Sequence, residues 1–172
     1  TLVDTQIVKN GEVLIAPQTP AAPAGKKFVG WQVGTTPVVF GTAITVTTTE
    51  TDTANAVFAD VYYVFFRDDT GRVYQTVEGV AGTVVQANVI FPVANNKSIT
   101  GWYTESGLIN KVTSVTLTNA NITLWPKVET GFWITYDSHG GTYIPPKFYT
   151  VGQTPAAPSP APVRLGYNFA RW

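Results

Sequence analysis

Apolar residues along this chain gather in short runs bounded by turn-forming residues, which is typical of β-strands. Thr, Val, Tyr, Phe and Trp dominate these runs, and such residues favour strands. Two stretches, Asp68–Gly71 and Ser138–Gly141, read as tight hairpin turns. No long amphipathic helix is predicted, and Val84–Phe91 is the best candidate for a short one. The predicted strands are Val61–Phe66, Gly71–Val77, Val112–Leu117, Ile122–Trp125 and Phe132–Tyr136.

Three tryptophans mark an internal repeat, because they are spaced 71 and 70 residues apart. A glycine stands 20 residues before each tryptophan. These pairs are Gly11 and Trp31, Gly82 and Trp102, and Gly152 and Trp172. The spacing predicts about two and a half copies of one module.

The other shared positions are almost all glycine, aromatic or aliphatic. Phe28 aligns with Ile99 and Phe169, and Gly30 aligns with Gly101. Residues of these types specify a fold through turn geometry and core packing, and they do not specify a reaction. We expect Trp31 and Trp102 to be core residues in equivalent places.

A period near 70 residues is longer than that of a solenoid, whose units run about 20–50 residues. About 70 residues can just close a core of their own. We therefore expect small domains in series at residues 1–60, 61–128 and 129–172. The first has no equivalent of Tyr62–Gly71 and the third none of Tyr103–Val128, which predicts open sheet edges in both. The first residue is Thr and Met is absent, so we expect a piece of a longer protein.

Composition restricts the partners. The chain has 11 basic and 11 acidic residues and is only 13% charged, which argues against nucleic-acid binding and against an electrostatic membrane anchor. No apolar run reaches the roughly 20 residues that span a bilayer. Cysteine is absent, which excludes disulfides and thiolate metal sites.

The segment Phe132–Trp172 resembles the Listeria–Bacteroides repeat, also called the internalin B-repeat. It contains Tyr-Asp-Ser-His-Gly-Gly, a proline-rich middle, and Gly-Tyr-Asn-Phe-Ala-Arg-Trp at Gly166–Trp172. Gly25–Trp31 and Gly101–Thr104 match the same signature around their tryptophans. The resemblance implies a mainly β fold (α+β, β-grasp or ubiquitin-like modules in tandem with little helix). It also implies a bacterial surface location and no catalytic residues.

Residues that could carry chemistry are few. His139, the single histidine, is expected in a turn, and Asp68 with Asp69 is expected to form a hairpin turn rather than a calcium site. No catalytic residue, cofactor or metal is predicted. Carboxylates are scattered singly, at Asp4, Glu12, Glu50, Asp52, Asp60, Glu78, Glu105 and Glu129. The aromatics to inspect first for sugar stacking are Tyr62, Tyr63, Tyr103, Trp125 and Trp133.

The favoured function is a non-enzymatic tandem-repeat segment of a bacterial cell-surface protein, acting as a stalk, spacer or adhesion array. One alternative is a subunit of an extracellular fibre completed by strand exchange, in which residues near Thr1–Val8 or Phe132–Trp172 pair with another copy or with parent sequence. Another is an accessory carbohydrate-binding module of a polysaccharide-active enzyme. Further expected partners are a host or matrix protein or a glycan.

Overall fold

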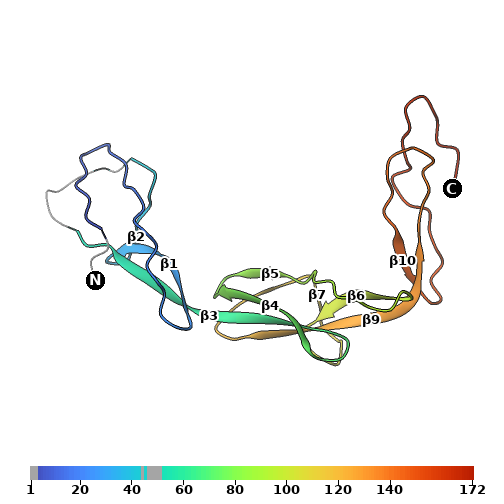
Figure 1. The fold of residues 1–172 in the computed structure, drawn as a ribbon, viewed down its shortest axis with the longest axis horizontal. Helices are drawn as coiled ribbons and strands as arrows, with labels where there is room; N and C mark the ends of the chain where they lie inside the picture. The colour runs from blue at the N-terminus through green and yellow to red at the C-terminus, as the bar shows by residue number, and fades with distance from the viewer. Residues whose placement is uncertain (1–3, 44, 46–51) are drawn as a thin grey trace. The chain divides into compact units, whose positions relative to one another are not determined.

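The computed structural model describes residues 4–43, 45 and 52–172, and this part of the chain is built from strands (Figure 1). Glu50 and the first three residues of the segment Thr1–Val8 lie outside the described residues. The strands are β1 (Lys26–Val33), β2 (Thr36–Pro37), β3 (Asn55–Arg67), β4 (Val73–Val80), β5 (Val84–Gln86), β6 (Lys97–Tyr103), β7 (Lys111–Val112), β8 (Ser114–Thr116), β9 (Ile122–Ile134) and β10 (Lys147–Thr150).

The prediction of a mainly β fold is confirmed, since no helix occurs among the described residues. Val84–Phe91, the best candidate for a short helix, contains none: Val84–Gln86 forms β5, which pairs with β8. Two adjacent valines favour a strand, and burial of Val85 fixes that choice. The β-grasp assignment stays a prediction.

No helix in the described part of the chain is long and apolar enough to cross a membrane.

The predicted strands are found, with one change. Val61–Phe66 lies in β3, Gly71–Val77 overlaps β4, and Val112–Leu117 covers β7 and β8. Ile122–Trp125 and Phe132–Tyr136, predicted as separate strands, are largely joined in the 13-residue strand β9. The strands around the tryptophans, β1 and β6, were not among those predicted.

The chain divides into two compact units. One takes in the N-terminal part as far as Tyr63, with Glu78–Val84 and Thr116–Asn121. The other contains Val64–Val77, Val85–Val115 and Ile122–Trp172. The division into three domains after residues 60 and 128 stays a prediction.

In the first unit, β1 pairs with the first half of β3 in an antiparallel ladder. Phe28 lies opposite Phe58, and Gly30 lies opposite Val57, so Val29 is the extra residue of a β-bulge. Trp31 then lies opposite Ala56. The short strand β2 pairs with β1 on its other edge.

In the second unit, β6 and β9 repeat that ladder residue for residue. Ile99 lies opposite Val128, Gly101 opposite Lys127, and the register shifts between them as it does at Val29. Trp102 takes the place of Trp31. The sequence repeat is therefore also a repeat of strand register, bulge included.

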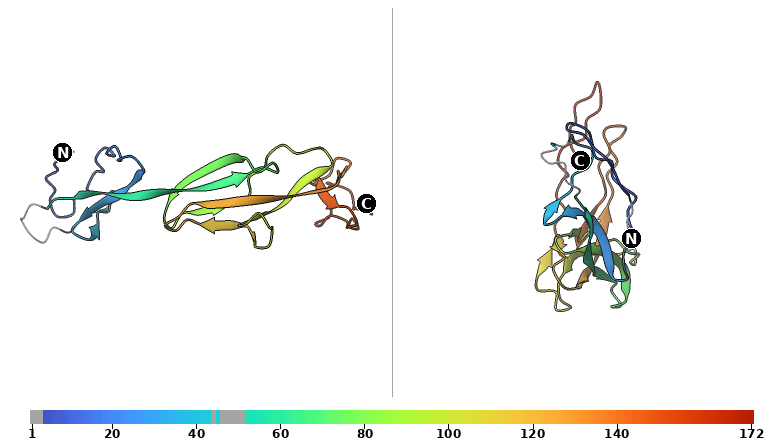
Figure 2. Two further views of the ribbon diagram at one scale, coloured as in Figure 1. Left: turned by 90° about the horizontal axis from the view of Figure 1, so that it is seen from below. Right: turned by 90° about the vertical axis from the view of Figure 1, so that its left-hand side faces the viewer.

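The second unit also holds a parallel pair, formed by Val64–Phe66 of β3 and Ile122–Leu124 of β9. The strand order here is β3-β9-β6-β7, and β4 pairs with β3. The left view of Figure 2 shows β3 and β9 lengthwise, as long ribbons. Further along, Gly131–Ile134 of β9 pairs with β10 in an antiparallel ladder.

The buried apolar side chains gather in the middle repeat. Trp102 is 3% exposed and meets the ring of Phe66 edge-on at 5.0 Å. Phe91 packs against the same indole at 6.2 Å. Eight of the nine buried apolar residues in the described part lie between residues 61 and 128, so this repeat has a closed core. The nine are Val64, Phe66, Val85, Phe91, Trp102, Tyr103, Leu117, Leu124 and Tyr149.

The aromatic contact of the middle repeat recurs in the third. Tyr136 and Trp172 stand 70 residues after Phe66 and Trp102, and their rings meet edge-on at 5.2 Å. Trp172 is nevertheless 42% exposed. The third repeat therefore forms the same pair without the surrounding cover.

Replacing Trp102 by Ala should lower the free energy of unfolding by about 3–5 kcal/mol, because it removes a large buried ring from a small core. Chemical denaturation followed by circular dichroism measures the loss. The matched variant Trp133→Ala should cost much less, since Trp133 is 49% exposed. Equal losses for the two variants would contradict the core role of Trp102.

Candidate functional site

The glycine column forms one turn in all three repeats. Gly11, Gly82 and Gly152 have φ of +85°, +89° and +89°, a region that favours glycine. Each is the third residue of a four-residue turn closed by a backbone hydrogen bond. Those bonds run from Glu12 N–H to the Lys9 carbonyl (3.0 Å), Thr83 N–H to the Val80 carbonyl (3.0 Å), and Gln153 N–H to the Thr150 carbonyl (3.1 Å). A positive φ at the third position is the signature of a type II turn.

A side chain closes the same turn a second time. The residue after each glycine accepts a hydrogen bond from the backbone N–H at the start of the turn. The bonds are Lys9 to Glu12 Oε2 (2.8 Å), Val80 to Thr83 Oγ1 (3.1 Å) and Thr150 to Gln153 Oε1 (2.8 Å). We call this arrangement the turn clasp. The turn clasp is not visible when the repeats are aligned, because Glu12, Thr83 and Gln153 are different residue types, although each has an acceptor oxygen.

The glycine before the tryptophan has a different role in each of the first two repeats: a backbone conformation at Gly30 and space for a neighbouring side chain at Gly101. Gly30 has φ of +155°, which side chains rarely adopt. Gly101 has no such φ, but an added Cβ there would come within 2.6 Å of Lys111 Cε. The Lys111 ammonium donates to the Thr100 carbonyl at 2.8 Å, so the missing side chain admits that lysine. In the third repeat Arg171 takes this column outside any strand.

The residue three positions before each tryptophan is Phe28, Ile99 or Phe169. These side chains are less enclosed than the buried Trp102. Phe28 meets Trp31 at 5.6 Å and Phe58 at 5.9 Å, both edge-on, and it is half-buried. Ile99 is half-buried in β6. Phe169 is 42% exposed and meets Trp172 at 5.3 Å.

Asp68 organises the hairpin turn between β3 and β4. Its Oδ1 accepts hydrogen bonds from the Thr70 hydroxyl (2.7 Å) and from the backbone N–H groups of Thr70 (2.9 Å) and Arg72 (3.0 Å). The Thr70 hydroxyl, then the two backbone donors and the Arg72 charge, lower the pKa of the Asp68 carboxyl. One of the two carboxylate oxygens of Asp68 is therefore engaged with the turn.

His139 lies in a turn, with φ of +53°. Its backbone N–H donates to Asp137 Oδ1 at 2.8 Å, and this bond is the main cause of the lowered pKa of Asp137. Its imidazole stands 3.5 Å from the same carboxylate, with both side chains exposed. Ser138 lies between them in sequence, but its hydroxyl donates to the Gly141 carbonyl at 2.9 Å. The hydroxyl and the imidazole thus do not form the bonded pair that an activated serine needs.

Glu105 has the most strongly shifted carboxyl, with a pKa lowered to about 2. The Thr104 hydroxyl is the largest cause, and the backbone N–H of Asn110 follows. The carboxylate also accepts from the backbone N–H of Ile109 at 2.7 Å. These bonds close the loop between β6 and β7. A perturbed pKa can mark a catalytic group, but here it reflects a surface loop capped by a half-buried glutamate.

Four of the five aromatics named for sugar stacking are at least partly covered. Tyr103 is buried, and Tyr62 and Tyr63 are half-buried. The Arg67 guanidinium lies 4.8 Å above the ring of Trp125. Trp133 is half-exposed, and Phe148 leans against it at 5.2 Å with the rings inclined by 59°. The pair does not offer one flat platform.

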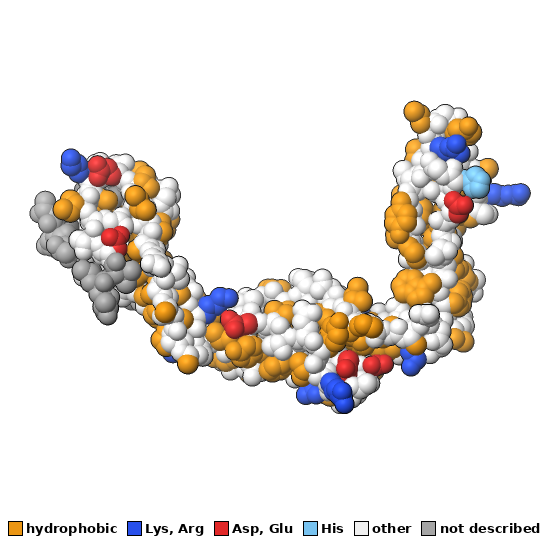
Figure 3. Space-filling model, viewed as in Figure 1, with side chains coloured by type: hydrophobic (Ala, Val, Ile, Leu, Met, Phe, Trp, Pro, Cys, Tyr) orange, Lys and Arg blue, Asp and Glu red, His pale blue; other side chains and the backbone are white. Residues whose placement is uncertain are grey.

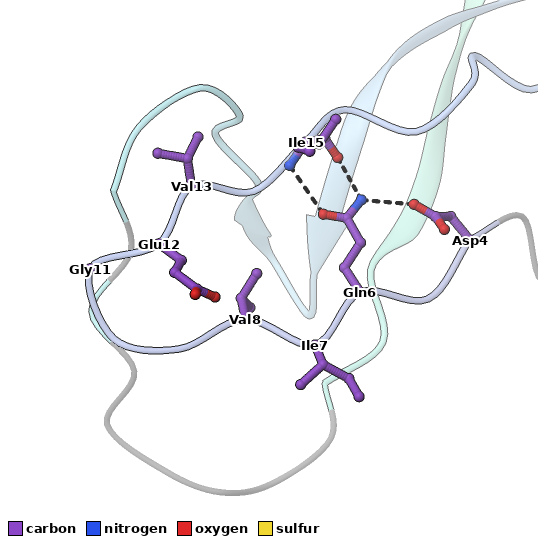
Figure 4. A pocket seen from close by; sticks show the side chains of 8 residues that line it. All are labelled: Asp4, Gln6, Ile7, Val8, Gly11, Glu12, Val13 and Ile15. Atoms are coloured by element: carbon purple, nitrogen blue, oxygen red, sulfur yellow. Dashed lines mark hydrogen bonds between the residues drawn. The ribbon is translucent and has the colours of Figure 1, made fainter.

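A shallow hollow of about 600 Å³ lies beside the N-terminal segment (Figure 4). The Gln6 side-chain amide crosses it, donating to the Ile15 carbonyl (2.7 Å) and accepting from the Ile15 N–H (3.1 Å). The same amide donates to Asp4 at 2.7 Å. The Gln6 side-chain amide is thus fully used in hydrogen bonds within the N-terminal segment. Among the described residues no three His, Cys, Asp or Glu gather as a metal site would require.

Apolar side chains at the surface are numerous and charges are few (Figure 3). In the first unit Ile7 and Ile15 are exposed, and in the third repeat Val151, Leu165 and Tyr167 are. Scattered apolar residues are normal on a protein surface. Among the described residues, the exposed large apolar residues are most numerous in the third repeat, which has a single buried one, Tyr149.

The model of the Listeria–Bacteroides repeat domain matches residues 62–127 and 132–172, which is more than half of the chain. The chain belongs to the Listeria–Bacteroides repeat family. The first match spans the middle repeat from β3 to β9, and the second runs from β9 to Trp172. Membership of this family suggests a repeat region of a bacterial surface protein. Neither the curated proteins nor the solved structures include a significant match to the chain.

The positive φ of Gly82 in the turn of the middle Listeria–Bacteroides repeat can be tested by substitution. Gly82→Ala should lower the free energy of unfolding by about 1–2 kcal/mol, because a side chain disfavours positive φ. No atom lies within 4 Å of the added Cβ, so the cost comes from the backbone alone. The control is Gly107→Ala, whose Cβ makes ordinary contacts with Ile109 and whose φ is not positive. Thermal unfolding compares the two; a neutral Gly82→Ala would contradict the assignment.

Proposed function

We propose that this chain is a non-enzymatic spacer segment of a bacterial cell-surface protein. The observation that supports this most is the repetition of backbone devices. The bulged ladder recurs in β1–β3 and β6–β9, and the turn clasp recurs at Gly11, Gly82 and Gly152. In the first two repeats, the shared glycine, aromatic and aliphatic positions of the signature all lie in a strand or a turn. A region selected to hold a surface protein at a distance requires these features and no others.

The lack of chemistry is part of this proposal. The three groups that the sequence or the pKa values single out each serve local structure: Asp68 and His139 lie in turns, and Glu105 caps a loop. His139 is exposed, and Asp68 and Glu105 are half-buried in surface turns and loops, whereas catalytic groups work in enclosed sites that exclude water.

We expect no turnover when the purified chain is screened against glycan and peptide libraries. A histidine without a bonded nucleophile and carboxylates engaged in turns offer no acid–base pair. The informative control is Glu105→Gln, since Glu105 has the most perturbed carboxyl. Reproducible turnover that this variant or another single Asp or Glu substitution abolishes would refute the proposal.

The spacer proposal also predicts the hydrodynamic state. Domains in series should behave as an elongated monomer, which size exclusion combined with small-angle scattering measures at several concentrations. Growth into polymers with rising concentration would instead support the fibre alternative, in which a neighbouring copy covers the exposed side of Trp172. Trp172→Ser, which removes that contact, should leave a monomer unchanged and would weaken a polymer.

A carbohydrate-binding role depends on Trp133, the most exposed of the five aromatics considered. Glycan-array binding that Trp133→Ala removes would favour that alternative over a spacer.

A further inference from the structure

Two strands pass from one repeat into the next without a linker. In β3, Asn55–Asp60 pairs with β1, and Val64–Phe66 pairs with β9. In β9, Ile122–Leu124 pairs with β3, and the strand then continues along β6 and β10. Each long strand therefore closes one repeat and opens the following one. Tension applied to the chain passes along these strands directly into the sheet of the middle repeat.

The direction of the pairing decides how that tension acts. The chain enters the middle repeat at the N-terminal end of the paired part of β3 and leaves through the C-terminal end of β9. Since these strands are parallel, pulling the entry and the exit apart slides one strand along the other. The ladder hydrogen bonds are then loaded together, in shear. In an antiparallel hairpin pulled at its open end, the bonds break one after another.

The side chains around this pair strengthen it against sliding. Val64, Phe66 and Leu124 are fully buried on the two strands. At the entry, Asn121 Oδ1 accepts a hydrogen bond from the backbone N–H of Tyr63 at 2.9 Å. Sliding the strands would break this bond together with the ladder and expose the buried side chains. All of these contacts resist the same displacement, so their contributions add in the unfolding barrier.

We propose that the parallel pair of Val64–Phe66 with Ile122–Leu124 is a mechanical clamp, and that the middle repeat carries tension between the two ends of the surface protein. This proposal rests on the spacer function, because only a chain anchored at both ends is put under tension. Its physical content is a direction-dependent resistance to force, which forced unfolding measures as an unfolding rate.

The chain has no cysteine, so introduced cysteines provide unique attachment points for force spectroscopy on the full chain. Asp60→Cys with Thr130→Cys loads the clamp in shear. Asp60→Cys with Ala120→Cys pulls at the N-terminal ends of both strands and opens the pair bond by bond. All three positions are exposed, and both double variants lose the same Lys26–Asp60 ion pair. The two variants therefore differ mainly in pulling direction.

We expect the shear pair to unfold at a force several times that of the opening pair, at the same loading rate. A second opening pair, Asp60→Cys with Thr118→Cys, guards against a local effect of the Ala120 substitution. Circular dichroism before attachment selects variants with unchanged strand content. Equal forces in the two directions would overturn the clamp.

Asn121→Ala provides a side-chain test in the shear geometry. It removes the bond to Tyr63 and should lower the unfolding force, whereas Asn119→Ala, an exposed neighbour, should not. An unchanged force in Asn121→Ala would remove Asn121 from the clamp and count against the proposal. The scattering experiment tests the spacer function separately, since an elongated monomer with equal forces in both directions would be a spacer without a clamp.

Discussion

The edge-to-face contact between Trp102 and Phe66 ties together strands that are not neighbours in the sheet. Phe66 lies on β3 and Trp102 on β6, and β9 runs between these two strands. The two rings therefore meet across the central strand, whose Leu124 is also fully buried. A hairpin alone would be marginal in water, and the contact converts three strands into one cooperative unit. Tyr136 and Trp172 repeat it, so the repeat is organised around this pair.

Sharing a strand between repeats places a second constraint on the sequence. Each long strand must satisfy the register of the repeat it closes and the packing of the repeat it opens. The first half of β3 follows the bulged ladder with β1, and its second half supplies the buried Val64 and Phe66. A shift by one residue in the first half would turn every side chain of the second half to the opposite face. The bulge at Val29, repeated at Thr100, therefore sets the register of two repeats at once.

Local residue types predicted the turns and the strand character well, because those features depend on nearby backbone preferences. Asp68–Gly71 forms a turn through its own side-chain hydrogen bonds, and the glycine column requires positive φ. The sequence did not predict that β9 is one continuous strand, since Pro126 and Gly131 lie between its two predicted parts and both residue types usually interrupt strands. Strand β6 was not predicted for a related reason: Gly101 lies within it, and the pairing with β9 that makes this segment a strand is not visible in a single sequence. Pairing partners decide such positions, and a single sequence does not display them.

The turn clasp shows what kind of information the repeat preserves. Its glycine is the same in every copy because only the backbone conformation matters there, whereas the clasping residue changes among Glu12, Thr83 and Gln153 because any acceptor oxygen suffices. A binding or catalytic site would require the reverse pattern, with side-chain chemistry kept and local geometry free to adapt. In this chain the repeated feature is geometry at the turn, at the bulge and at the tryptophan. Repetition of geometry with free side-chain chemistry is the pattern that the proposed spacer function requires.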